Sequence, residues 1–146
     1  MEIIIDRLVR IKAPIKRPNH HAAAIFTKSN IYSVGINEYD NKPYPGCSYD
    51  AHAEMVAFLK IPPPKNTRKF RKVNLIVIRV DKHGKLKYSK PCMKCIEFIG
   101  YHSYNMMCSI DNIYYSTEDG TIIRRKFMDL YLEKDGHRSK RFTNKN

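Results

Sequence analysis

His52-Ala53-Glu54 and Pro91-Cys92-Met93-Lys94-Cys95 are the two stretches that decide how this 146-residue chain folds. Together they form the pattern H-x-E…P-C-x-x-C. A catalytic zinc ion typically has three protein ligands and a fourth position that is open to water. One imidazole and two thiolates supply such a set, so we expect His52, Cys92 and Cys95 to bind zinc. Glu54 then stays off the metal and carries protons.

A structural zinc site is the alternative interpretation of the same cysteines. Such a site normally closes with a fourth protein ligand, and Cys47 lies five residues before His52. A closed site needs neither the carboxylate of Glu54 nor the proline before Cys92. The two-part pattern therefore favours the catalytic interpretation.

Both stretches are predicted to lie at the beginnings of helices. Asp50 is suitably placed to cap a helix that follows His52, and Pro91 suits the first turn of a second helix. Backbone N–H groups and the helix dipole would stabilise the thiolates of Cys92 and Cys95 there.

The remainder of the chain alternates helical and strand patterns in a single domain, 1–146. The other expected elements are a helix at 2–12, an antiparallel hairpin of 22–27 and 31–36, a buried strand at 73–80, and strands at 110–115 and 121–123. This order predicts a sheet with helices packed on its faces. A basic tail at about 134–146 follows.

The two motifs resemble those of the cytidine deaminase superfamily, over roughly 11–115 of this chain. The chain looks most like the small CMP/dCMP-type deaminases of large DNA viruses. The resemblance implies a three-layer α/β/α sandwich with a mixed five-stranded sheet. It also implies zinc-dependent hydrolytic deamination of a cytosine-type base in a nucleotide or nucleoside, with Glu54 as the catalytic proton carrier.

The resemblance also suggests residues that bind the substrate. Gly35-Ile36-Asn37 is similar to the family's G-x-N, which implies that Asn37 contacts the sugar. The backbone N–H of Ala53 would hold the base carbonyl. Tyr44 and Tyr49, in the loop after Asn37, could stack on a base, and we expect Lys90 at the rim of the site.

The direction of the last strand stays open. Asp119-Gly120 is typical of a hairpin turn, which would make the fifth strand antiparallel. Relatives that act on free nucleosides often have that arrangement. The His-type motif is instead typical of dCMP, tRNA-adenosine and APOBEC-type relatives, whose fifth strand is usually parallel.

The net charge of +13 suggests a polyanionic partner. Lysine enrichment from an AT-rich genome would explain part of it equally well. Two further hypotheses therefore stand beside nucleotide deamination. One is a deaminase that acts on RNA or single-stranded DNA, and the other is a zinc-stabilised nucleic-acid-binding module without activity.

Topology sorts the basic residues into two groups. Those near 82–90, together with His20 and His21 before the first strand, are expected at the active-site rim. The two histidines are interpreted as loop or substrate-side residues rather than zinc ligands. The dense run at 65–72 is expected at the far end, as a solvated connector.

The remaining expectations concern location and assembly. Apolar residues 3–5 form too short a run for a signal peptide, and no stretch approaches a membrane span. Four cysteines without a secretion signal indicate a reducing, cytoplasmic setting, in which Cys47 and Cys108 are free thiols. By resemblance, a homo-oligomer is expected.

Overall fold

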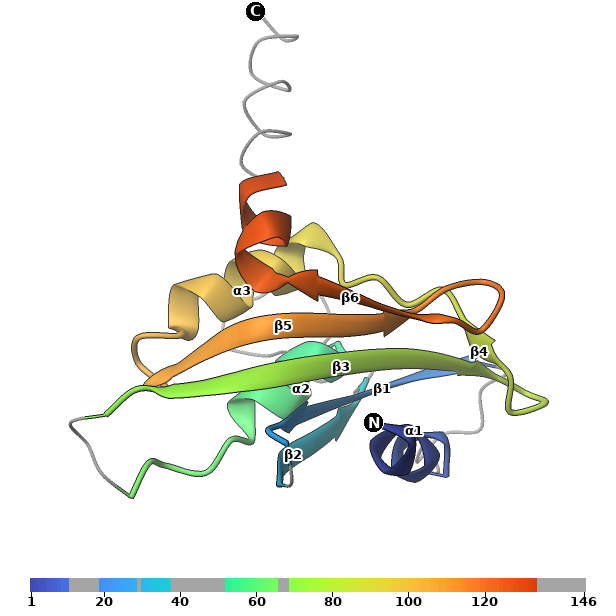
Figure 1. Ribbon diagram of the computed structural model, residues 1–146, viewed down its shortest axis with the longest axis horizontal. Coiled ribbons are helices and arrows are strands. Elements are labelled where there is room, and N and C mark those ends of the chain that lie inside the picture. The colour runs from blue at the N-terminus through green and yellow to red at the C-terminus, as the bar shows by residue number, and fades with distance from the viewer. Residues whose placement is uncertain (11–18, 29, 38–51, 66–68, 134–146) are drawn as a thin grey trace, which may run out of the picture.

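The computed structural model describes residues 1–10, 19–28, 30–37, 52–65 and 69–133. A mixed sheet with strand order β2-β1-β3-β5-β6 forms its centre (Figure 1). Its strands are β1 (Asn19–Phe26), β2 (Ile31–Ile36), β3 (Arg71–Asp81), β5 (Cys108–Ser116) and β6 (Ile122–Lys126). A further two-residue strand, β4 (Leu86–Lys87), pairs with the end of β3 and was not predicted from the sequence.

Strand directions follow from the pairing register. β1 runs antiparallel to both β2 and β3, and β3 runs parallel to β5. β6 is antiparallel to β5. The turn between them contains Gly120 at φ 85°, a conformation that glycine adopts at little cost. The hairpin suggested by Asp119-Gly120 is therefore present, and the fifth strand is antiparallel.

Helices cover both faces of the sheet, as predicted (Figure 1). Helix α1 (Glu2–Val9) packs against β1 and β3 on one face through the buried Leu8. Helices α2 (Ala53–Leu59) and α3 (Met93–His102) pack on the opposite face. A helical segment at 127–133 adds Phe127 and Leu130 to that second core.

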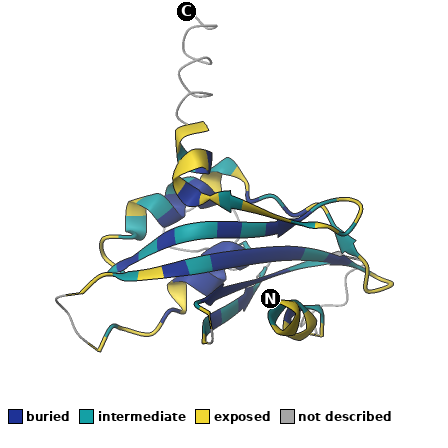
Figure 2. Ribbon diagram, viewed as in Figure 1, coloured by how far each residue is buried: buried dark blue, intermediate teal, exposed yellow. Residues whose placement is uncertain are grey.

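The central strand β3 is buried on both faces, as its nearly continuous apolar run predicted (Figure 2). Side chains alternate between the two cores along a strand. Val77 belongs to the core beneath α2 and α3, whereas Ile78 belongs to the core beneath α1. This alternation assigns a face to every residue of the strand, including its polar ones.

The two helix starts differ in detail from the prediction. Helix α2 begins at Ala53 with His52 as its N-cap, so the expected cap Asp50, which lies outside the described residues, is not the N-cap. Helix α3 begins at Met93 with Cys92 as its N-cap, which leaves Pro91 before the helix rather than in its first turn. The physical reason is that the carbonyl groups of His52 and Cys92 already accept the first helical hydrogen bonds.

Helix α2 approaches β2 unusually closely at Gly35. A Cβ atom on Gly35 would lie 2.4 Å from the backbone nitrogen of Ala57 and 2.6 Å from the backbone oxygen of Ala53. The Ser33 hydroxyl also donates a 2.6 Å hydrogen bond to the Ala57 carbonyl. Small residues on both elements thus fix where α2, and with it His52, lies over the sheet.

Candidate metal centre

The two halves of the sequence motif meet because α2 and α3 begin beside each other on the same face of the sheet. His52 and Cys92 both have extended backbones, with φ/ψ of −80°/158° and −73°/163°. An N-cap residue in this conformation directs its side chain across the open end of its helix. Cys95 then lies one turn into α3, on the same side as Cys92.

The four side chains form one compact cluster. The Nδ1 atom of His52 lies 3.1 Å from Cys95 Sγ and 3.5 Å from Cys92 Sγ. The two sulfur atoms are 3.3 Å apart. Glu54 Oε1 lies 3.7 Å from the same Nδ1 atom. Every ligand atom of the cluster lies within 4.8 Å of every other.

The four side chains of the cluster differ in how far they are buried, so that a reactant could approach the cluster from one side only. Cys95 is fully buried, and Glu54 is 4% exposed. The side chain of His52 is 44% exposed to solvent, and Cys92 is exposed as well. The protein therefore closes over the inner side of the cluster and leaves the outer side open to solvent.

The titratable groups of the cluster shift one another's pKa values strongly. A hydrogen bond from Cys95 lowers the pKa of the Cys92 thiol to about 4, and the same contact raises the pKa of Cys95. Hydrogen bonds to Cys92 and Glu54 raise the pKa of His52 to about 10. Burial acts to raise the pKa of Glu54, but hydrogen bonds from His52 and Cys95 lower it on balance.

These donors fit a metal ion. One imidazole nitrogen and two sulfurs converge with a carboxylate, and nitrogen and sulfur ligands are typical of zinc. Cys47, which could close a structural site, lies outside the described residues. Cys108 is buried and free, as predicted, and lies apart from the cluster at the start of β5.

The residues predicted to bind the substrate come from several segments of the chain. Asn37 follows β2, and its Oδ1 atom accepts a 3.2 Å hydrogen bond from the His21 backbone N–H. Ala53 is the first residue of α2, where backbone N–H groups are not used within the helix. The Nζ atom of Lys90 lies 3.4 Å from Glu133 Oε1. Tyr44 and Tyr49 lie outside the described residues.

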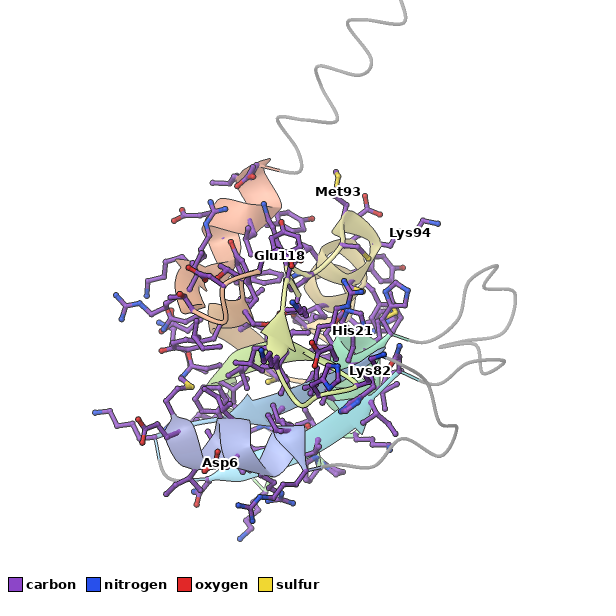
Figure 3. All side chains as sticks on the ribbon, turned by 90° about the vertical axis from the view of Figure 1, so that its right-hand side faces the viewer. Asp6, His21, Lys82, Met93, Lys94 and Glu118 are labelled. Atoms are coloured by element: carbon purple, nitrogen blue, oxygen red, sulfur yellow. The ribbon has the colours of Figure 1, made fainter. Side chains whose placement is uncertain are left out.

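The register of β1 against β3 shows which residues lie at the end of the sheet where the rim of the active site was expected. The residue pairs His21↔Arg79 and Asn19↔Asp81 put the end of β3 at the same edge as Asn37. Figure 3 views the molecule from this end, with His21, Lys82 and Lys94 labelled. His20 and His21, expected before the first strand, lie within β1. Neither belongs to the metal-binding cluster.

The described residues of the basic run, Lys65 and 69–72, lie at the other end of β3, as predicted. They contribute to a cavity of about 740 Å³ that contains no residue of the metal-binding cluster. The lining residues are Asn30, Tyr32, Pro62, Pro63, Pro64, Lys65, Lys69, Phe70, Arg71 and Lys72.

The strand register brings Arg79, which was not predicted as a site residue, to the same end of the sheet as Asn37. It is half-buried, and alternation along β3 places it on the same face as Val77, beneath α2 and α3. Its cross-strand partners are His21 in β1 and Lys87 in β4. The available signal was a single arginine that interrupts the apolar run at 73–80.

Comparisons with known proteins give a likeness among solved structures only. No protein-family model matches the chain, and no curated protein matches it significantly. Among solved structures, a dCMP deaminase from the cyanophage S-TIM5 in its apo form aligns at 17% sequence identity. The alignment covers 78% of this chain and 74% of that chain, with a TM-score of 0.44.

No helix in the described part of the chain is long and apolar enough to span a membrane. The expected mixed sheet is present, with helices on both of its faces. The four motif residues His52, Glu54, Cys92 and Cys95 lie together where helices α2 and α3 begin. The layered arrangement that the resemblance implied is therefore present, together with a His-Glu-Cys-Cys group that could hold a metal ion.

Proposed function

We propose that the protein is a zinc-dependent hydrolytic deaminase of a cytosine-type base in a nucleotide or nucleoside. The observation that carries the proposal is the position of Glu54 beside the three metal-binding side chains. Its Oε1 atom is 3.7 Å from His52 Nδ1, and the side chain is almost completely buried. A structural zinc site has no use for a buried carboxylate at that distance.

His52, Cys92 and Cys95 would hold the zinc ion. When bound, zinc lowers the pKa of a coordinated water molecule toward neutrality. Cys95 holds its position on the inner side of the cluster, because it is buried against the core beneath α2 and α3. The exposed side, at His52 and Cys92, is where water and substrate have access.

Glu54 would move the protons of the reaction. Its pKa is lowered by His52 and Cys95, so the carboxylate is ionised at neutral pH and can accept a proton from water. It would then deliver that proton to the ring nitrogen beside the amino group. As the carbon–nitrogen bond breaks, it would take a second proton from the hydroxyl group added to the ring carbon and give it to the departing ammonia. The backbone N–H of Ala53 and the side chain of Asn37 would orient the base and the sugar.

A panel of substrates tests the proposal. Zinc-loaded protein is incubated with dCMP, CMP, deoxycytidine, cytidine and a cytosine-containing oligonucleotide, and released ammonia and uracil product are measured. We expect turnover of at least one monomeric compound and none with Glu54→Gln. Deamination of the oligonucleotide alone would favour the polymer-editing hypothesis, which the net charge of +13 motivates. Binding of oligonucleotide without any turnover would favour a binding module.

A further inference from the structure

The end of β3 that lies away from the metal centre collects positive charge. No acidic residue occurs in the chain between Glu54 and Asp81, and none lines the cavity at this end. None of the ion pairs within the described ranges includes a basic residue of the cavity. Those basic residues are Lys65, Lys69, Arg71 and Lys72. Charge of one sign without local acidic partners attracts a polyanion.

Two exposed aromatic side chains lie beside these cations. Phe70 is 48% exposed, and Tyr104, in the turn between α3 and β5, is 78% exposed. Their ring centroids are 5.8 Å apart, with an angle of 48° between the ring planes. Phe70 also lines the cavity, together with the half-buried Tyr32 and the prolines at 62–64. The surface therefore combines ring faces with lysine side chains, a combination that binds unpaired bases and their phosphates.

Arg71 joins the segments that carry this surface. Its guanidinium group donates hydrogen bonds to the carbonyl oxygens of Pro62 and Met106, at 2.7 Å and 3.2 Å. Its backbone N–H donates to the Met107 carbonyl at 3.0 Å. The segment after α2 and the α3–β5 turn are thus both held to the first residue of β3. Because the acceptors are carbonyl groups rather than carboxylates, these hydrogen bonds leave the guanidinium charge in place.

The surface is too far from the metal centre for one small ligand to occupy both. The segment that leads into β3 and the short strand β4 lie at opposite ends of the sheet (Figure 1). At roughly 3.3 Å per residue, Arg71 and Arg79 of β3 are about 26 Å apart. The cavity contains no residue of the metal-binding cluster. The charge and the rings at this end therefore point to a ligand other than a nucleotide bound at the metal centre.

We propose that this surface binds single-stranded nucleic acid. We call it the far-end surface and define it by Lys65, Lys69, Phe70, Lys72 and Tyr104. The lysine ammonium groups would contact phosphates, and the two rings would stack on bases without regard to sequence. A duplex fits less well, because its bases stack on one another and do not offer their faces. An acidic peptide would use the lysines and leave the rings exposed. The inference concerns a second site and does not depend on the proposed deaminase function.

Fluorescence anisotropy with the zinc-loaded chain tests the role of the rings. The probe is a labelled short oligothymidylate, since thymine has no amino group to lose and binding is measured without turnover. Phe70→Leu combined with Tyr104→Leu should weaken its binding by about 5- to 100-fold, the range for loss of a base stacked on an aromatic ring. Tyr88→Leu is the matched control and should leave binding unchanged, because Tyr88 is 47% exposed but lies beside β4, at the opposite end of the sheet.

The salt dependence of the same binding tests the role of the lysines. Lys69→Gln combined with Lys72→Gln should lower the slope of log K against log salt by about 1.4, since each phosphate contact on a single strand contributes roughly 0.7. Arg7→Gln combined with Arg10→Gln removes the same charge at exposed positions in and just after α1, and should leave the slope unchanged. All the substituted side chains are exposed, so folding should be unaffected, and melting temperatures check this.

Equal weakening by the two pairs of charge substitutions would show that only net charge matters, and would overturn the inference. Equal affinity for oligothymidylate and for an abasic strand with the same number of phosphates would also overturn it, because the rings would then have no role. A polyglutamate peptide that binds as tightly as oligothymidylate would assign the surface to an acidic protein partner instead. Loss of binding in Tyr88→Leu but not in the Phe70 and Tyr104 variant would move the site to the other end of the sheet.

Discussion

His52 Nδ1 lies 3.1 Å from Cys95 Sγ, although the two residues are 43 positions apart in the chain. The contact joins the N-cap of α2 to the first turn of α3. Both helices are fixed by the core beneath them, so the contact is set by the packing of the whole sheet. Changes in that packing should therefore alter the metal centre even where they do not touch a ligand.

Removing one thiolate should release the metal. We expect wild-type protein to contain one zinc ion per chain and Cys92→Ala to lose it, with a lower melting temperature because bound metal stabilises the folded state. Elemental analysis of purified protein measures the zinc. Cys108→Ala, which removes a free buried thiol outside the cluster, is the control and should retain zinc. Full zinc content in Cys92→Ala would show that the ligand assignment is wrong, and zinc loss in Cys47→Ala would indicate a closed structural site.

Glu54→Gln should abolish most of the turnover while leaving zinc and fold intact. A general acid–base group typically contributes about 10²–10⁴-fold, and the amide fills the same space but cannot accept a proton. Steady-state kinetics on the best substrate measures the loss, and elemental analysis checks the zinc. Glu118→Gln, at an exposed position in the β5–β6 turn, should leave the rate unchanged. Near-normal turnover in Glu54→Gln would exclude the proton-carrying role.

Gly35→Ala should destabilise the protein and weaken zinc binding together. The new Cβ would meet the backbone of α2 at 2.4 Å and 2.6 Å, so the helix that carries His52 must move away from β2. Overpacking of this kind typically costs about 1–3 kcal/mol. Urea unfolding measures the stability, and competition with a chelator measures the zinc affinity.

Gly100→Ala provides the matched control for that substitution. Its nearest new contact, at 2.8 Å, is with the Tyr131 side chain, which can move, whereas the backbone of α2 cannot do so locally. Alanine also has a higher helix propensity than glycine. We therefore expect Gly100→Ala to cost less than Gly35→Ala and to leave zinc affinity unchanged. Equal effects at the two positions would contradict the role of the close α2–β2 approach.

The β5–β6 turn should show a pH-dependent contribution to stability. Hydrogen bonds from Thr117 and Thr121 lower the pKa of the Asp119 carboxyl from 3.8 to about 2. Because the folded-state pKa is lower than the unfolded one, the stabilisation is complete above 3.8 and is lost as the pH falls through about 2. Carbon-13 NMR of the carboxyl group measures the pKa directly.

Asp119→Asn tests the energetic consequence of that shift. The variant should unfold more easily than the wild type at neutral pH, and the difference should shrink as the pH falls through about 2. Asp129→Asn removes the same charge at an exposed position of the helical segment 127–133 and serves as the control. A difference between wild type and Asp119→Asn that stays constant with pH would show that the ionised carboxylate is not the cause.

The sequence alone predicted the antiparallel first hairpin, the buried central strand and the order of helices and strands along the chain, apart from β4 and the helical segment 127–133. These features follow from local periodicity and from breakers such as Pro62 and Gly120, which act within a few residues. It also predicted that His52, Cys92 and Cys95 act together, and the structure brings them into one group with Glu54 that could hold a metal ion. Both helix starts were predicted to within a few residues.

Only the tertiary structure decided the direction of β6, the close approach at Gly35 and the position of Arg79 beside the metal centre. Each depends on pairing between segments distant in the sequence, and a pattern of apolar residues does not specify a cross-strand neighbour. In the sequence, Arg79 is one arginine within an apolar run. The register of β3 against β1 and β4 places it opposite His21 and Lys87.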